Sequence, residues 1–438
     1  MNDQSQSQEK RQLMLDRAQG SMVGLALGDA LGTTLEFKTK DSYQPITDMN
    51  GGGPFSLNAG EWTDDTSMML CLAESLLATG KHDPKDQIQR YLSWWKEGHN
   101  SVNGQCFDIG NTVSDALTKY QFDNVANAGS SDEYSAGNGS LMRLAPIPIF
   151  YSSYRHVSEQ NVIKIAGESS LTTHAEQRTI ESCQIMAWLL YQIYNSSHCV
   201  SDKTDLFNRL STHWSSCDIH PNLKKVIQGS FLTKTRAQIR GSGFVVHSLE
   251  AALWAFANST DFRDGALLAA NLGEDADTTA AIYGQLAGAY YGYSQLPTDW
   301  LSKLALHDKI KEYATLLVNA PKQEDLSSFE DKVITQPKNS CNRLIYQALY
   351  DHNFILQDYP WMDYPNRHLL TSSNYQQPQY NGDQRKALIE SLTFIQCFQL
   401  ITTVIRADRF NEGIWRRFQE DGSLKLWLKQ LHLFIENQ

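Results

Sequence analysis

Two short acidic clusters contain the residues best suited to chemistry in this sequence. The first is TDDT at 63–66, directly before the helical spacing of Ser67 to Leu77, and the second is DADT at 275–278, directly before Thr279 to Tyr291. A single Asp or Thr at a helix start is explained by N-capping, which stabilises a helix by about 1 kcal/mol. Two acids at each of two helix starts exceed what capping requires.

If the fold brings the two clusters together, four carboxylates share one pocket, and Glu36 is a candidate for a fifth. Their mutual repulsion would raise their pKa values or push them apart, and a divalent cation removes that conflict. Carboxylate and Thr hydroxyl oxygens, with no His or Cys nearby, suit Mg²⁺ or Mn²⁺ and argue against Zn²⁺. The sequence alone does not bring the clusters together, so capping remains the alternative at each of them.

A loop of small residues, SAGNGSLMR at 135–143, is a third candidate feature. Such a loop can present backbone N–H groups to a phosphate, and the start of an adjoining helix adds a favourable dipole. A glycine turn before a helix is also common without any ligand. His174 and His247 lie in apolar neighbourhoods, where hydrogen-bonded, partly buried histidines are ordinary. No Ser/His/Asp or Cys/His spacing indicates a nucleophile.

The elements that must position these residues are helices. Apolar residues recur at helical spacing from about Gln12 to Gly292, and alternating strand patterns are scarce, which predicts an all-α fold. Glycine destabilises a helix interior by roughly 1 kcal/mol, so two strips of small residues predict the close approach of two helix axes, with loop-forming glycine as the alternative. The strips are Gly20, Gly24, Gly28 and Gly32, and Ala280, Gly284, Gly288 and Gly292.

Composition limits the function classes. The chain has 438 residues, 41% hydrophobic and 20% charged, which is typical of soluble globular proteins. A net charge of -11 without a dense Lys/Arg cluster argues against nucleic acid as a partner. No apolar run approaches the roughly eighteen residues of a membrane span, and the polar start resembles no secretory signal, so a cytoplasmic location without membrane partners is expected. Seven cysteines without a CxxC pair suggest neither a disulfide framework nor a thiolate zinc site.

The chain is expected to have four parts. They are a polar tail at 1–11, a large helical domain at 12–320, a polar, proline-bracketed linker at 321–340, and a mostly helical module of unknown role at 341–438.

Five ordered motifs between Gly20 and Gly292 resemble the ADP-ribosylglycohydrolase family, which includes the dinitrogenase reductase-activating glycohydrolases and the ADP-ribosylarginine hydrolases. The motifs are GSMVGLALGDALGTTLEF, GEWTDDTSMML, SAGNGSLMRLAPI, GFVVHSLEAALWAF and NLGEDADTTAAIYGQLAGAYYG. The resemblance implies a compact, orthogonal, all-α fold with a site for two Mg²⁺ ions, for which Mn²⁺ is a substitute. Beyond Cys341 the resemblance ends.

Site roles follow from the resemblance residue by residue. It implies metal ligation by Thr63, Asp64, Asp65, Asp275, Asp277 and Thr278. It implies catalytic roles for Glu36, Asp65 and Asp277, and a structural role for Asp29. It implies an ADP-ribose pocket formed by Gly137, Asn138, Gly139, Ser140, Arg143 and His174. Two departures, Glu274 in place of the usual glycine and His247 in place of a frequent aspartate, leave the ligands intact and bear on substrate preference.

The expected activity is removal of ADP-ribose from a modified protein side chain, arginine above all, which reverses an ADP-ribosyltransferase. Serine-linked and small ADP-ribose derivatives stay open as substrates. The alternative is an immunity protein that neutralises an ADP-ribosyltransferase toxin by direct contact, with or without hydrolysis. A metal-dependent phosphoesterase is disfavoured because no His ligands accompany the carboxylates.

Overall fold

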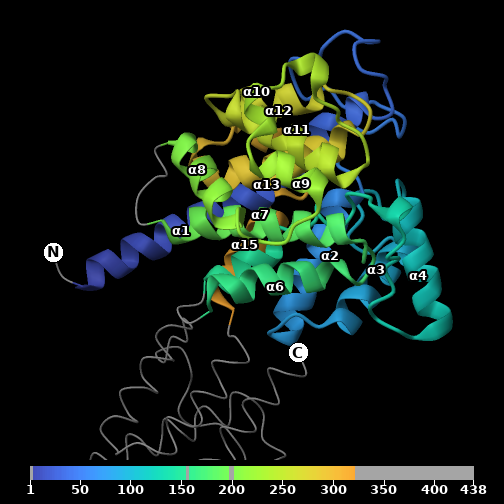
Figure 1. Ribbon diagram of the computed structural model, residues 1–438. Coiled ribbons are helices and arrows are strands. Elements are labelled where there is room, and N and C mark those ends of the chain that lie inside the picture. The colour runs from blue at the N-terminus through green and yellow to red at the C-terminus, as the bar shows by residue number, and fades with distance from the viewer. Residues whose placement is uncertain (1–2, 154–156, 197–201, 321–438) are drawn as a thin grey trace, which may run out of the picture. The chain divides into compact units, whose positions relative to one another are not determined.

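The computed structural model describes residues 3–153, 157–196 and 202–320, and Figure 1 shows that this part of the chain is built of helices. It contains no β-strand, which confirms the all-α prediction. The α-helices are α1 (Asp3–Gly32), α2 (Asp64–Thr79), α3 (Pro84–Glu97), α4 (Asn111–Asp123), α5 (Pro146–Ser152), α6 (Glu159–Ser170), α7 (Gln177–Asn195), α8 (Lys203–Trp214), α9 (Pro221–Ile227), α10 (Ser230–Thr233), α11 (Val245–Ala257), α12 (Phe262–Ala270), α13 (Ala276–Tyr291), α14 (Thr298–Lys303) and α15 (His307–Asn319). Four short 3-10 helices are η1 (Thr33–Leu35), η2 (Glu133–Ser135), η3 (Arg236–Gln238) and η4 (Tyr293–Gln295).

The chain divides into two compact units. The first comprises Met1–Leu77 and His82–Val318, and the second comprises Ala78–Lys81 and Asn319–Gln438. The predicted linker at 321–340 and module at 341–438 lie outside the described residues. Most of the segment expected as a polar tail belongs to the first turns of α1, and the described side chains there, from residue 8 onward, are exposed. The predicted domain boundaries stay predictions.

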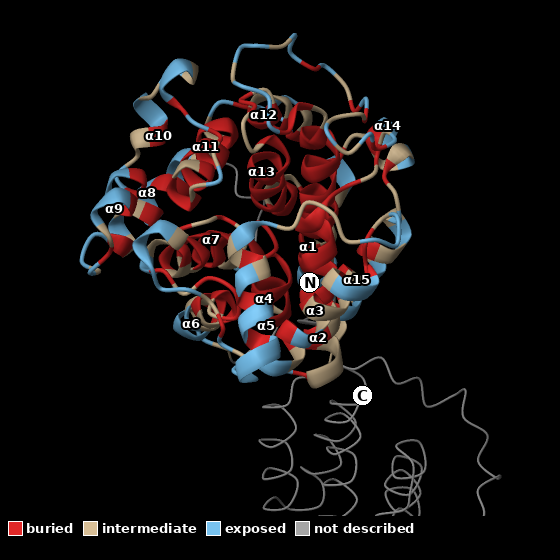
Figure 2. Ribbon diagram, turned by 90° about the vertical axis from the view of Figure 1, so that its right-hand side faces the viewer, coloured by how far each residue is buried: buried red, intermediate tan, exposed pale blue. Residues whose placement is uncertain are grey.

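The glycine strips pack α1 directly against α13. A Cβ atom added at Gly284 would lie 2.1 Å from the carbonyl oxygen of Gly24, and one added at Gly28 would lie 2.1 Å from that of Ala280. Real Cβ atoms do not approach backbone this closely, so only glycine allows the two backbones to touch. Figure 2 shows α13 and the part of α1 that packs against it buried among the described helices. The close approach of two helices that the strips predicted is confirmed.

The two central helices run antiparallel, which sets the place of the site. Gly20 faces Gly288 near one end of the pair, and Gly32 faces Ala276 at the other. The C-terminal end of α1 therefore lies beside the first residue of α13. Asp29 and Glu36, the acidic residues near that end of α1, are thereby brought close to the DADT segment.

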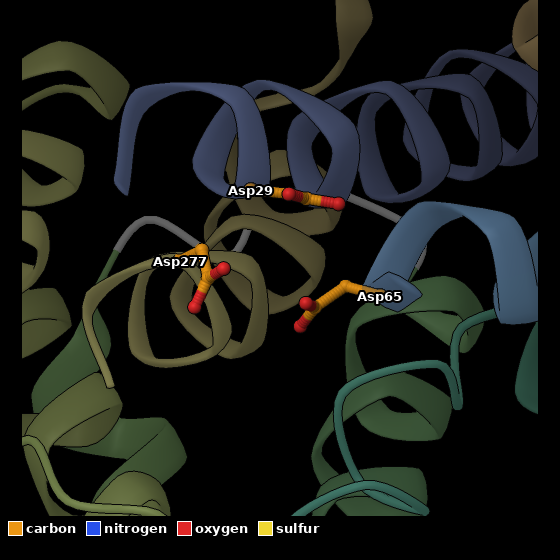
Figure 3. Close-up of side chains that lie close together, drawn as sticks. All are labelled: Asp29, Asp65 and Asp277. Atoms are coloured by element: carbon orange, nitrogen blue, oxygen red, sulfur yellow. The ribbon is translucent and has the colours of Figure 1, made fainter. Parts of the chain in front are cut away.

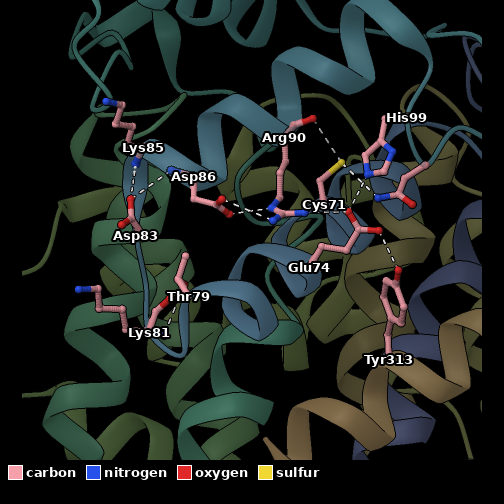
Figure 4. Close-up of polar contacts among 11 residues, drawn as sticks. Cys71, Glu74, Thr79, Lys81, Asp83, Lys85, Asp86, Arg90, His99 and Tyr313 are labelled. Atoms are coloured by element: carbon pink, nitrogen blue, oxygen red, sulfur yellow. Dashed lines mark hydrogen bonds and ion pairs between the residues drawn. The ribbon is translucent and has the colours of Figure 1, made fainter. Parts of the chain in front are cut away.

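The helix that begins with the TDDT segment, α2, is held in its second half by Glu74 (Figure 4). The Glu74 carboxylate accepts hydrogen bonds from the Tyr313 hydroxyl on α15 at 2.8 Å and from Arg90 Nη1 on α3 at 3.2 Å. His99 Nε2 lies 2.6 Å from the same carboxylate. Three separate segments thus hold α2 in position, and its first residues project toward α1. None of the described helices has the length and apolar character needed to cross a membrane.

Candidate active site

The starts of α2 and α13 lie together, although 214 residues separate Thr63 from Asp277. The Thr63 hydroxyl oxygen lies 2.8 Å from Asp29 Oδ1, 3.2 Å from Asp65 Oδ2 and 3.3 Å from Asp277 Oδ2. Figure 3 shows these three carboxylates gathered between α1, α2 and α13. A hydroxyl donates a single hydrogen, and Asp29 is its nearest acceptor. The oxygens of Asp65 and Asp277 therefore face a hydroxyl oxygen without receiving its proton.

Asp29 provides the N-terminal capping of α2 from a different helix. Its Oδ1 accepts from the backbone N–H of Thr63 at 2.8 Å, and its Oδ2 accepts from the backbone N–H and hydroxyl of Thr66 at 3.0 and 2.7 Å. Burial raises the pKa of Asp29 to about 6, although the hydrogen bonds from Thr66 and Thr63 oppose the rise. Both Asp29 oxygens therefore accept from the start of α2, and the structural role that the resemblance implied for Asp29 stays a prediction. Because Asp29 satisfies these donors, Asp64 and Asp65 are not needed as caps.

Glu36 does the same for α13. Asp275 stands at the N-cap position but its side chain makes no capping hydrogen bond. Glu36 Oε2 instead accepts from the backbone N–H of Ala276 at 2.8 Å and from that of Asp277 at 3.5 Å. Burial raises the pKa of Glu36, and repulsion from Asp277 and then Asp275 adds to the effect. The capping alternative thus does not account for the acids that open either helix.

The acids that open the two helices repel one another in a buried space. Burial is the main cause that raises the pKa values of Asp64 and Asp65 well above the ordinary range, and neighbouring carboxylates add to the rise. The same two causes raise the pKa values of Asp275 and Asp277 to about 7 each. Asp65 Oδ1 is buried without a hydrogen-bond partner. Such a site favours protonation or a bound cation.

The carboxylate oxygens can surround a metal ion. Among the described residues, two groups have ligand atoms within 4.8 Å of one another, and Asp277 belongs to both. The groups are Asp29, Asp65 and Asp277, and Glu36, Asp275 and Asp277. Asp64 and Thr278 are also buried at the starts of their helices. Three of the predicted ligands, Asp65, Asp275 and Asp277, belong to these groups together with Glu36 and Asp29, whereas Thr63, Asp64 and Thr278 belong to neither.

Asp108 is a site residue that the sequence analysis missed. It lies in the loop before α4 with a left-handed backbone, φ 59°. Burial raises its pKa to about 7, and repulsion from Asp275 adds to the rise. It is also the carboxylate whose charge most affects the pKa of Asp64 after burial. We refer to these side chains as the acidic cluster, which comprises Asp29, Glu36, Asp64, Asp65, Asp108, Asp275 and Asp277.

The predicted pocket residue Asn138 holds a member of the acidic cluster. Its Nδ2 donates to Asp275 Oδ2 at 2.6 Å and to the Ser248 hydroxyl at 2.9 Å. Its backbone N–H donates to the carbonyl oxygen of Gly243 at 3.1 Å. Asn138 thus fixes one oxygen of Asp275, and its own amide is not free for a phosphate.

The glycine loop rests on His174. A Cβ atom at Gly139 would lie 2.9 Å from the His174 ring, and one at Gly137 would lie 3.3 Å from it. His174 is 1% exposed, and burial followed by repulsion from Arg143 lowers its pKa to about 3. The Gly137 N–H donates to the Ser135 carbonyl oxygen. Of the four amides expected to receive a phosphate, those of Gly139 and Ser140 therefore remain.

Arg143 lies beneath the loop, with 1% of its surface exposed. Its Nη2 donates to the hydroxyls of Thr173 at 2.7 Å and Thr172 at 3.3 Å, and its guanidinium lies 4.3 Å from the centre of the Tyr91 ring. The Ser140 hydroxyl accepts from Ser170 at 2.8 Å inside the same core. These predicted pocket side chains support the loop from behind.

A cavity of about 630 Å³ opens beside the glycine loop. It is lined by Thr112, Glu133, Tyr134, Ala136, Gly137, Arg178, Gly243 and Phe244. A Cβ atom at Gly243 would lie 3.3 Å from Asp275 Oδ2, so the cavity borders the acidic cluster. The start of α4 and the Arg178 side chain favour an anion there, whereas Glu133 in the lining and Glu176, which is paired with Arg178, oppose it.

Comparison with known proteins finds relatives that cover most of the described chain. The family model described as ADP-ribosylglycohydrolase matches residues 10–326, and a family of unknown function matches residues 318–437. The chain is 42% identical to the protein named ADP-ribosylarginine hydrolase Tri1 from Serratia proteamaculans, over 71% of this chain and 81% of that one. A protein of the same name from Pseudomonas putida is 43% identical over 72% of this chain and 81% of that one.

Two further relatives extend the comparison. The chain is 30% identical to the ADP-ribosyl-[dinitrogen reductase] glycohydrolase of Rhodospirillum rubrum, over 66% of this chain and 90% of that one. A solved structure titled ADP-ribosylglycohydrolase-related protein complex superposes with a TM-score of 0.62 and 39% identity, covering 71% of this chain and 99% of that one.

Proposed function

The chain belongs to the ADP-ribosylglycohydrolase family, and we propose that it hydrolyses the N-glycosidic bond joining ADP-ribose to the guanidinium of an arginine in a modified protein. It is an enzyme of the glycohydrolase type. Two relatives with more than 40% identity are named ADP-ribosylarginine hydrolase, which supports arginine as the linkage. The observation that carries the proposal is the meeting of the TDDT and DADT segments around Thr63.

We propose two Mg²⁺ ions as the cofactor, with Mn²⁺ as a substitute. The residues fit such ions because every donor is an oxygen and because Asp65 Oδ1 is buried without a partner. Thr63, Asp64, Asp65, Asp275, Asp277 and Thr278 would hold the ions. Bound divalent ions would orient the ribose hydroxyls and make an attacking water more acidic.

Glu36 is the residue we propose as the proton carrier. Its Oε2 accepts from the start of α13, and its side chain also hydrogen-bonds Asp277. With divalent ions offsetting the repulsion between these acids, the Glu36 carboxylate would accept a proton from the attacking water. The water oxygen then bonds to C1 of the ribose as the bond from C1 to the guanidinium nitrogen breaks. Glu36 returns the proton to the departing nitrogen. Burial and the neighbouring carboxylates raise the pKa of Glu36, which suits a group that must hold a proton between these steps.

The cavity beside the glycine loop would take the ADP part. The amides of Gly139 and Ser140, the start of α4 and Arg178 would surround the pyrophosphate. Arg178 is held in place by Glu176 at 2.9 Å and lies 5.2 Å from the Phe244 ring centre. A rigid cation next to an aromatic face is a suitable environment for a nucleotide.

The test is hydrolysis by the purified chain, in Mg²⁺, of a peptide with ADP-ribosylarginine and of one with ADP-ribosylserine. We expect release of ADP-ribose from the arginine peptide. Asp65→Asn and Asp277→Asn should lower kcat/KM at least about 100-fold while the protein stays folded, because each removes a carboxylate from the shared site. Asp123→Asn, at the exposed end of α4, is the matched control.

Turnover of the serine peptide alone would reject the proposed linkage, and full activity of either Asn variant would reject the proposed ligands. The binding-protein alternative, with an ADP-ribosyltransferase toxin as its partner, stays a prediction.

A further inference from the structure

Three phenylalanines form a second feature beside the acidic cluster. The Phe37 and Phe55 ring centres are 6.2 Å apart at an interplanar angle of 72°, and those of Phe55 and Phe107 are 5.2 Å apart at 52°. The three residues come from different segments, and Phe37 is 67% exposed. None of them lines the cavity beside the glycine loop. We call these residues the aromatic rim.

Both ends of the aromatic rim are covalently joined to the acidic cluster. Phe37 follows Glu36, and Phe107 precedes Asp108. Neighbouring Cα atoms are about 3.8 Å apart, so the rim begins within one residue of two cluster carboxylates. The backbone N–H of Phe37 also donates to the carbonyl oxygen of Glu274 at 2.8 Å, next to Asp275.

Stability does not explain an exposed ring at position 37. Phe37 has φ 59°, a left-handed conformation that is unfavourable for a bulky side chain. Its partner Glu274 has φ 61° and returns a hydrogen bond from its N–H to the Lys38 carbonyl oxygen at 2.7 Å. A pair of strained residues that holds an aromatic side chain toward solvent beside a reactive centre is typical of a functional site.

The cavity and the aromatic rim therefore offer different chemistry next to the acidic cluster. The cavity borders Asp275 through Gly243 and is suited to the anionic ADP part. The aromatic rim adjoins Glu36 and Asp108 along the chain, and of its three rings that of Phe37 is exposed. A flat cation is the group that satisfies both rings and carboxylates, because a guanidinium stacks on an aromatic face and pairs with acids.

We infer that the aromatic rim receives the guanidinium of the arginine from which ADP-ribose is cleaved, and so determines the specificity for arginine over hydroxyl-linked substrates. The inference rests on the proposed function. In this arrangement the ADP part fills the cavity, the scissile bond lies over the acidic cluster, and the departing side chain lies against Phe37. A serine linkage offers no planar cation to these rings.

The experiment compares Phe37→Leu and Phe37→Tyr with the wild type, with Phe122→Leu on α4 as an exposed control. All variants keep a non-glycine residue at φ 59°, so the backbone at position 37 carries the same strain. The measurements are KM for the ADP-ribosylarginine peptide and inhibition constants for the two product sides, L-arginine methyl ester and ADP-ribose. Melting midpoints show whether each variant is folded.

Phe37→Leu should raise KM and the inhibition constant of arginine methyl ester about 5- to 30-fold, with inhibition by ADP-ribose unchanged. Phe37→Tyr keeps the ring and should stay within about twofold of the wild type. Phe107→Leu provides a second, independent variant. Normal values for Phe37→Leu would show that the ring is not a cation site, and equal losses for both products would show general damage instead.

A third outcome separates the inference from its premise. If the wild type releases ADP-ribose from the arginine peptide but Phe37→Leu and Phe107→Leu bind arginine methyl ester normally, the proposed function stands and the inference is wrong. If the wild type leaves the arginine peptide intact, the proposed function and the inference both fail.

Discussion

At the scale of single residues, the site depends on side chains that hold other side chains. Asp29 and Glu36 satisfy the first amides of α2 and α13, and Asn138 fixes one oxygen of Asp275. The acids that open α2 and α13 are therefore not needed to cap these helices. In metal sites generally, replacing a residue that hydrogen-bonds a ligand weakens metal binding about 10- to 100-fold.

Asn138→Ala should weaken the binding of Mg²⁺ about 10- to 100-fold, because Asp275 Oδ2 loses its donor. The measurement is the Mg²⁺ concentration that gives half-maximal activity. Ser248→Ala is the matched comparison, since it removes the other acceptor of the same amide and leaves the bond to Asp275. Equal effects of the two substitutions would contradict the role given to Asn138.

His174 should make the folding stability depend on pH. Its pKa is about 3 in the folded protein and about 6.5 when unfolded, so the unfolded chain binds more protons below pH 6.5. The contribution to stability is present above that pH and is lost as the pH falls, by about 1.4 kcal/mol per unit. Urea unfolding between about pH 7 and about pH 5 should show a steeper loss for the wild type than for His174→Asn. Parallel curves would mean that His174 is protonated without effect.

The residues that sequence reasoning found and missed differ in one physical respect. The acid pairs of TDDT and DADT could be predicted as site residues because capping a helix start requires only one of the two acids. Asp108 is a lone acid in a loop, and only its burial beside Asp64 and Asp275 makes it part of the site. Arg143 was predicted for the pocket, yet its side chain points into the core, and no local pattern encodes that direction.

At the scale of elements, the pairing of α1 and α13 positions the acids. The strips of small residues predicted this contact from spacing alone, and the backbones of Gly24 and Gly284 touch as a result. The antiparallel direction could not be read from the strips, because either direction places glycine against glycine. That direction is what brings the end of α1 to the start of α13.

Gly284→Ala should destabilise the protein by about 1–3 kcal/mol or more, since its Cβ would lie 2.1 Å from a carbonyl oxygen of α1. It should also raise the Mg²⁺ concentration needed for activity, because α13 moves with Asp277. Gly167→Ala on α6 is the control, as its Cβ meets only the side-chain atoms of Gln184 and Ile180. Urea unfolding measures the first effect and Mg²⁺ titration the second. Equal results for the two variants would contradict the importance given to the backbone contact between Gly24 and Gly284.

At the scale of the whole molecule, the acidic cluster connects parts of the chain that are remote in sequence. Members stand at positions 29, 65, 108 and 277, and the chain as a whole carries a net charge of -11. A divalent ion bound there would act on the stability of the domain as a whole and not only on one loop.

Mg²⁺ should therefore raise the free energy of unfolding, by about 2.7 kcal/mol when the ion is at about a hundred times its Kd. Calorimetry with Mg²⁺ and with a chelator measures the difference. Asp65→Asn should lose most of this gain and should exceed the wild type in stability when the metal is removed, because an amide has no ionised form for burial and the neighbouring carboxylates to disfavour. An identical gain in wild type and variant would place the ion elsewhere.

The contact between the glycines of α1 and α13 also limits how such an enzyme can change. Side chains in an ordinary helix interface can be exchanged for larger or smaller ones, and the helices adjust their separation by fractions of an ångström. Here the spacing is already the minimum that two backbones allow, so it offers no graded adjustment. Evolution of this scaffold is consequently expected to act on the side chains around the acidic cluster and on the segments outside this pair of helices, and not on the distance between the two backbones.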